Sequence, residues 1–180
     1  ALTELMAEVV LCLSPSVNAG YQKLKEKLIA SRSCVFGKLE RVEPRVAQAL
    51  VRYSYEQARA ICSQMRMWNA ADIPGYRTKI LDGNHLSGTE HRLKELRTER
   101  AAALPGASLV VLDPRCRAIQ DMFPIEDGHA QERSFLDDVI ETVEAKDLWV
   151  ADRNFCTHKF MYVIDKREAA FVIRHHENVI

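Results

Sequence analysis

The chain has 180 residues, of which 47% are hydrophobic and 28% charged, and its 25 Lys and Arg are balanced by 25 Asp and Glu. This composition is that of a folded globular chain, which excludes wholesale disorder. No stretch reaches the roughly 20 apolar residues that span a bilayer, and acidic residues interrupt the apolar opening segment, so neither a membrane span nor a secretory signal is expected.

The five cysteines are scattered along the chain and form no CxxC pair. Because structural zinc sites need complete sets of ligands, this spacing predicts free thiols in a reducing compartment such as the cytoplasm. Residues 1–76 carry 10 Lys and Arg against 7 Asp and Glu, whereas residues 77–180 carry 15 against 18. The front part is therefore mildly basic and the back part mildly acidic.

The front part has helical patterns. After Ser14 as a possible N-cap with Pro15 at the first helical position, apolar residues recur at helical spacing through residues 17–28. A second helix is predicted from Glu43 and Pro44 onward, and its apolar stripe consists of Val46, Leu50, Tyr53, Ile61 and Met65. Arginines 45, 52, 59 and 66 follow another line of this helix, spaced by seven. Such a row suits either a phosphate backbone or an ordinary solvated face.

Beyond a boundary at Pro74 and Gly75 the pattern changes to that of strands. We expect strands near residues 78–82, 108–112, 117–123, 147–152 and 170–175 in one sheet, with a helical insertion after Gly88. The first three strands predict an antiparallel meander, and the later ones alternate with helices, which favours a parallel part covered by helices. The expected organisation is a helical region over 1–76 and an α/β domain over 77–180.

Two acids stand at comparable places in this pattern. Asp82 is predicted to end the first strand, and Asp152 the fourth, 70 residues later. If those strands are neighbours, both carboxylates lie at one sheet edge and suit Mg²⁺ or Mn²⁺, which prefer oxygen ligands. The alternatives are a tight turn at Asp82 and Gly83 and a helix cap at Asp152, since Asp favours both places.

The strings ILDGNHL, LPGASLVVLDP, EDGHAQERSFLDDV, DLWVADRNFCTHKF and AAFVIRHHE resemble the core of the DDE transposases of bacterial insertion sequences, in particular the insertion-sequence-four family. The resemblance covers residues 77–178, and ADRNF is its most specific element. It implies a ribonuclease H-like fold, in which a mixed sheet with flanking helices follows a helical N-terminal region. In that family the first two catalytic, metal-binding acids match Asp82 and Asp152.

The family's third acid is a glutamate in a Tyr-x2-Arg-x3-Glu-x6-Lys helix, and that pattern is absent from these residues. Glu177 lacks this motif, so we do not expect it to substitute. We therefore expect a core truncated before its third acid and catalytically silent by itself. Glu132, at the start of a helix, is expected to serve the helix dipole.

The resemblance implies a DNA transposase that cuts and joins DNA at mobile-element ends with Mg²⁺ or Mn²⁺. Expected partners are the terminal inverted repeats of its own element, target DNA and a second copy of the chain in the DNA complex, all in the bacterial cytoplasm. Arg153, beside Asp152, and Arg45, Arg52 and Arg59 are candidates for DNA contacts. The alternatives are a non-catalytic DNA-binding remnant and a ribonuclease H-like nuclease unrelated to transposition.

Overall fold

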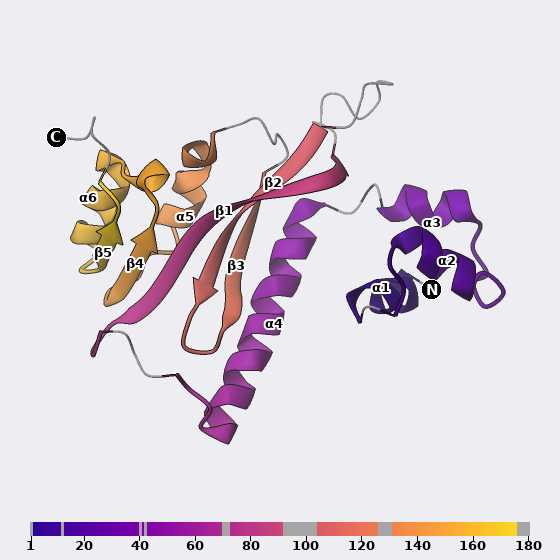
Figure 1. The fold of residues 1–180 in the computed structure, drawn as a ribbon, viewed down its shortest axis with the longest axis horizontal. Coiled ribbons are helices and arrows are strands. Elements are labelled where there is room, and N and C mark those ends of the chain that lie inside the picture. The colour runs from indigo at the N-terminus through magenta and orange to yellow at the C-terminus, as the bar shows by residue number, and fades with distance from the viewer. Residues whose placement is uncertain are drawn as a thin grey trace. The chain divides into compact units, whose positions relative to one another are not determined.

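A computed structural model describes residues 2–11, 13–39, 41, 43–69, 73–91, 104–125 and 131–175 (Figure 1). The chain forms two compact units, Ala1–Glu43 and Pro44–Ile180. The boundary between the two units lies earlier in the chain than the change of pattern near residue 76. The long helix that begins at Pro44 therefore belongs to the same unit as the sheet. Within the described ranges, no helix has both the length and the apolar character needed to cross a membrane.

The first unit contains three short helices, α1 (Leu2–Val10), α2 (Val17–Leu24) and α3 (Arg32–Leu39). Its small core consists of Leu5, Tyr21, Leu28 and Val35. The predicted cap at Ser14 is wrong, because α2 begins later and its N-cap is Ser16, whose hydroxyl oxygen accepts from the Ala19 amide at 3.2 Å. The Ser14 hydroxyl instead donates to Glu8 at 2.9 Å.

The second unit is built on a five-stranded mixed sheet with the order β3-β2-β1-β4-β5. The strands are β1 (Arg77–His91), β2 (Leu104–Asp113), β3 (Ala118–Ile125), β4 (Asp147–Ala151) and β5 (Ala170–Ile173). The pairs β1–β2 and β2–β3 are antiparallel, and the pairs β1–β4 and β4–β5 are parallel. The predicted α/β fold with a meander followed by a parallel part is thus confirmed. Of the helical insertion predicted after Gly88, residues 92–103 lie outside the described residues.

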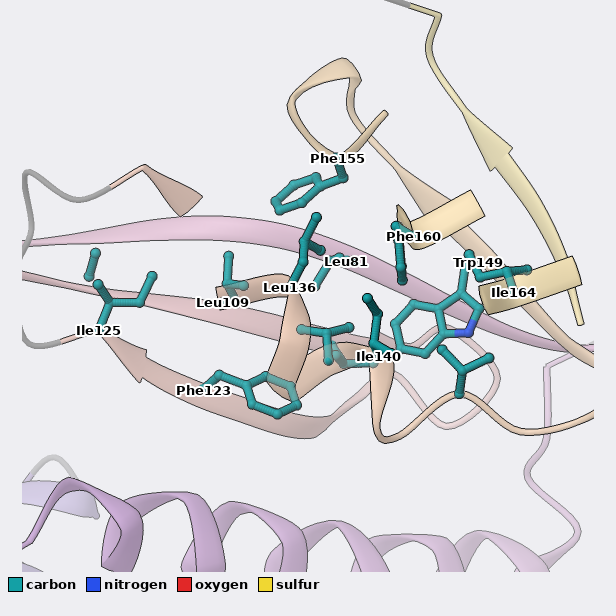
Figure 2. Close-up of a cluster of buried hydrophobic side chains, with 14 residues drawn as sticks. Leu81, Leu109, Phe123, Ile125, Leu136, Ile140, Trp149, Phe155, Phe160 and Ile164 are labelled. Atoms are coloured by element: carbon teal, nitrogen blue, oxygen red, sulfur yellow. The ribbon is translucent and has the colours of Figure 1, made fainter. Parts of the chain in front are cut away.

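Helices connect the later strands. The 3₁₀ turn η2 (Glu132–Phe135) and α5 (Leu136–Ile140) lead to β4, and η3 (Arg153–Phe155) and α6 (His158–Lys166) lead to β5. Thr157 caps α6, since its hydroxyl accepts from the Phe160 amide at 3.3 Å. The core joins side chains of β1 to β4 with those of α5 and α6, which therefore pack on one face of the sheet (Figure 2). Trp149 and Phe160 meet there edge to face, 5.7 Å between ring centres.

Helix α4 (Pro44–Met65) runs along β3 (Figure 1). Its predicted apolar stripe is not the side that packs on the sheet, because Val46, Leu50, Tyr53, Ile61 and Met65 are all exposed. Polar contacts hold a different face of α4 against the sheet. Arg52 donates two hydrogen bonds, of 2.9 and 2.8 Å, to Asp121 of β3, and the Tyr55 hydroxyl donates to Asp113 of β2 at 2.8 Å. Hydrophobic spacing alone does not reveal such long-range polar contacts.

Candidate functional site

Asp82 and Asp152 are brought side by side by the pairing of β1 with β4. The parallel register runs from Arg77 opposite Asp147 to Leu81 opposite Ala151, so the two aspartates each lie one residue beyond the last partnered pair. Leu81 is in the core and Ala151 packs against it. Because side chains alternate between the faces of a strand, Asp82 belongs to the face of β1 opposite α5 and α6, whereas Asp152 directly follows the end of β4. Both are exposed.

Asp82 lies within β1, and the prediction that it ends this strand is wrong. Pairing with β2 continues through Asp82 opposite Val110 and Gly83 opposite Leu109, and β1 extends to His91. A tight turn at Asp82 and Gly83 is thereby excluded. The Gly83 amide donates to Asp82 Oδ1 at 2.9 Å.

Asp152 follows β4 directly and occupies the N-cap position of η3. Its backbone is extended, with φ −75° and ψ 169°, and its side chain makes no capping hydrogen bond. The Phe155 amide donates instead to the backbone oxygen of Asp152, at 3.0 Å. The capping alternative therefore does not account for the Asp152 carboxylate in the described part of the chain.

Glu132 is a third acid near this place, and its position in the sequence predicts only a helix start. A Cβ atom added to Gly83 would lie 1.8 Å from Glu132 Oε1, 2.3 Å from its Cδ and 2.9 Å from Oε2. The Glu132 carboxylate thus occupies the space that a side chain at position 83 would need. The available signal in the sequence is the glycine beside Asp82, since a glycine inside a strand marks close approach of another group.

The arginine candidates are separated in the fold. Arg153 follows Asp152 in η3 and is exposed. Arg45 and Arg59 are exposed on α4, where Arg59 lies 3.8 Å from Glu56. Since α4 runs along β3, and β2 separates β3 from β1, these arginines are not gathered at the two aspartates.

Arg52 is already engaged by Asp121. The hydrogen bond to this carboxylate raises the Arg52 pKa, and burial opposes the rise to a lesser extent. The two-pronged contact joins α4 to β3. Arg52 consequently holds α4 against β3 and is also a candidate for a DNA contact.

A second charged cluster lies at the other end of the same two strands. Asp147 is completely buried, and its Oδ2 lies 2.8 Å from Lys79 Nζ while its Oδ1 lies 2.9 Å from Arg77 Nη2. Lys79 is also buried, and its ammonium lies 5.1 Å from the centre of the Trp149 ring. Arg77 reaches Glu144 at 2.8 Å. Charge in this cluster is compensated, so its role is structural.

The chemistry of the aspartate pair suits a hard divalent cation. Two carboxylates supply only oxygen ligands, the kind that Mg²⁺ and Mn²⁺ take together with water. In the described ranges, however, no group of three or more His, Cys, Asp and Glu side chains is arranged to hold a metal ion. The pair Asp82 and Asp152 supplies two carboxylates, fewer side chains than such a group contains.

No model of a known protein family and no curated protein matches the chain.

Proposed function

We propose that this chain carries the first two metal-binding aspartates, Asp82 and Asp152, of a DNA transposase with a ribonuclease H-like core. The observation that carries the proposal is the parallel pairing of β1 with β4, because each acid directly follows one member of the last registered pair, Leu81 and Ala151. The sheet order, with an antiparallel meander joined to a parallel part, is compatible with this fold. The motifs around the two acids, above all ADRNF, supply the resemblance to transposases.

Asp82 and Asp152 are the residues that would hold Mg²⁺ or Mn²⁺. The ion, when bound, would polarise the phosphodiester and favour attack by water or a DNA 3′-hydroxyl in line with the leaving oxygen. The protein's own part is to hold the acids in place, and the hydrogen bond from the Gly83 amide restrains the Asp82 carboxylate. Arg153, exposed next to Asp152, is suited to a contact with a DNA phosphate.

The proposed partner is DNA at the ends of the mobile element. Arg45 and Arg59 on α4 are exposed cations that suit the phosphate backbone and would add affinity without reading sequence. Two element ends brought together would be served by two copies of the chain, so a homodimer on DNA is part of the proposal.

Binding of Mn²⁺ to the whole chain tests this function. Isothermal titration of the wild-type chain is expected to show weak binding, because two carboxylates alone fix a cation loosely. Asp82→Asn and Asp152→Asn should each abolish it. Asp138→Asn, which removes an exposed carboxylate of α5, should leave it unchanged. Mn²⁺ binding that survives in either site variant would contradict the proposal.

A non-catalytic DNA-binding protein is the second candidate. It is favoured by the lack of a three-ligand metal group among the described residues, combined with the exposed arginines. The two candidates differ in their response to Mn²⁺. DNA binding that Mn²⁺ and the aspartate variants leave unaltered would favour the second, whereas DNA binding strengthened by Mn²⁺ through Asp82 and Asp152 would favour the first.

A further inference from the structure

We propose that Glu132 is a positioning residue of the Asp82–Asp152 cation site, and that the missing side chain of Gly83 makes room for the Glu132 carboxylate. The Glu132 carboxylate lies against the backbone of β1 at Gly83, the residue next to Asp82. From there its negative charge reinforces the attraction of the two aspartates for a divalent cation. This inference rests on the function proposed above.

The space that Gly83 leaves empty is filled by a carboxylate. The nearest atom to a Cβ at position 83 would be Glu132 Oε1, at 1.8 Å, and the next two nearest are also atoms of this carboxylate. A Cβ essentially never approaches another heavy atom so closely, so an alanine would displace the carboxylate from this place. Since the Glu132 side chain is long and flexible, the displacement would alter its position without unfolding η2.

The charge at this place is close to the proposed site. Glu132 Oε1 lies 1.8 Å from the position of a Cβ atom on Gly83. A bond from Cα to Cβ spans about 1.5 Å and adjacent Cα atoms lie about 3.8 Å apart, so Glu132 Oε1 lies within about 7 Å of the Asp82 Cα. Glu132 is half-buried, and its side chain makes no hydrogen bond or ion pair with the residues of the described ranges. An uncompensated charge at such a distance is screened less than one in open solvent.

Glu132 acts across the strand and is not a shared ligand. Gly83 lies on the same side of β1 as the core residue Leu81, and alternation assigns Asp82 to the other side. This arrangement agrees with the lack of a three-ligand group in the described part of the chain. The segment η2, which contains Glu132, also contacts η3, the segment that follows Asp152.

The charge of Glu132 can be separated from its bulk by four variants of the whole chain. Glu132→Gln keeps the shape and removes the charge, and Gly83→Ala keeps the charge but displaces it. Each is expected to weaken Mn²⁺ binding by roughly threefold to tenfold, the size of a single through-space charge effect. The double variant G83A/E132Q should lose no more than the larger single loss, because both changes remove the same charge from the same place. Glu132→Asp should recover part of the affinity.

Two controls address net charge and glycine replacement. Glu141→Gln removes an exposed charge after α5 and should leave Mn²⁺ affinity unchanged, and so should Gly37→Ala, because a Cβ there meets nothing within 4 Å. Thermal unfolding without metal should place Glu132→Gln close to the wild type. Wild-type Mn²⁺ affinity in Glu132→Gln, or additive losses in the double variant, would overturn this inference alone. A wild-type chain without Mn²⁺ binding that depends on Asp82 would overturn the proposed function and this inference with it.

Discussion

The two ends of the β1–β4 pair carry charged residues in opposite arrangements. At the end where Arg77 is opposite Asp147, a completely buried carboxylate contacts two cations, Arg77 and Lys79. At the end beyond Leu81 and Ala151, Asp82 and Asp152 are adjacent and exposed, and no cation contacts either of them in the described part of the chain. The same two strands therefore hold one neutralised cluster and one uncompensated cluster.

This difference distinguishes a cluster with a structural role from a pair of acids for which we propose a functional one. Charge buried in a protein is tolerated only when it is paired, and the pair then resists the loss of either member. Adjacent carboxylates at a surface contribute no stability through their mutual repulsion, and ionisable groups in such an arrangement are candidates for a functional site. Substitutions at the two ends should consequently have opposite effects on stability.

Lys79→Met should have the largest effect, lowering the free energy of unfolding by about 3 kcal/mol. The substitution leaves Asp147 buried with only the half-exposed Arg77, and breaking a buried pair typically costs about 3–5 kcal/mol. Urea denaturation measures the change. Lys166→Met, at the exposed end of α6, should change stability by less than about 0.5 kcal/mol.

A second variant identifies the cause of that loss. K79M/D147N removes both charges while an Asn oxygen can still accept from the Glu144 amide, as Asp147 Oδ2 does at 2.8 Å. We expect it to recover more than half of the loss. If the double variant is as unstable as Lys79→Met, the loss of stability comes from disrupted packing around Trp149 and not from an unpaired charge.

Arg52 extends the comparison from strands to the arginine row of α4. Arg52→Ala should lower the free energy of unfolding by about 1–2 kcal/mol, because it leaves Asp121, buried at 6% exposure, without its guanidinium partner. Arg45→Ala, at an exposed position on the same helix, should leave stability unchanged. Both can be compared by urea denaturation.

For DNA affinity, unlike stability, we expect Arg45 and Arg59 to contribute as well as Arg52. Replacing Arg45, Arg52 and Arg59 together is expected to weaken DNA binding and flatten its salt dependence, since the slope falls by about 0.9 for each phosphate that is no longer neutralised. Arg45→Ala alone should reproduce part of this change. An unaltered salt slope in the triple variant would indicate that these arginines form an ordinary solvated face of α4.

The sheet could be predicted from the sequence because its strands are short apolar segments between turn residues. All five appear near the expected residues, and the first and fourth are neighbours, the condition on which the prediction of the aspartate pair depends. The packing of α4 could not be predicted in the same way. Its orientation depends on Arg52 and Tyr55 meeting acids that lie 69 and 58 positions later in the chain, and no local pattern contains that information.

The site was predictable only in part. Asp82 and Asp152 could be chosen from strand ends and motifs, although β1 continues past Asp82 because β2 still pairs with it. The approach of Glu132 to Gly83 joins residues 49 positions apart, and no local pattern contains that information. The buried partnership of Lys79 and Asp147 was missed because a lysine inside a strand gives no sign of a distant partner.

A third group of ionisable residues predicts a smaller effect, at high pH. Burial and the hydrogen bond to Asp113 raise the pKa of Cys116 from 9.0 to about 11 and also raise the pKa of Tyr55. The folded chain thus keeps protons that the unfolded chain releases first, so stability is full below about pH 9 and falls as pH rises toward about pH 11. Cys116 is partly exposed, and we expect a loss below about 1 kcal/mol. Urea denaturation of Cys116→Ser, which lacks the thiol, should show a shallower fall over this range.

Asp152→Asn should have the smallest effect, and in the opposite direction to Lys79→Met. Without divalent cations it removes repulsion between adjacent like charges and should raise the free energy of unfolding by roughly 0.2–1 kcal/mol. Mn²⁺ should reverse the order, because a cation that binds only the folded state stabilises the wild type in proportion to its occupancy and leaves the variant unaffected. Thermal unfolding with EDTA and then with increasing Mn²⁺ would follow this crossing. Parallel responses of the two proteins to Mn²⁺ would assign the uncompensated acids no part in binding the ion.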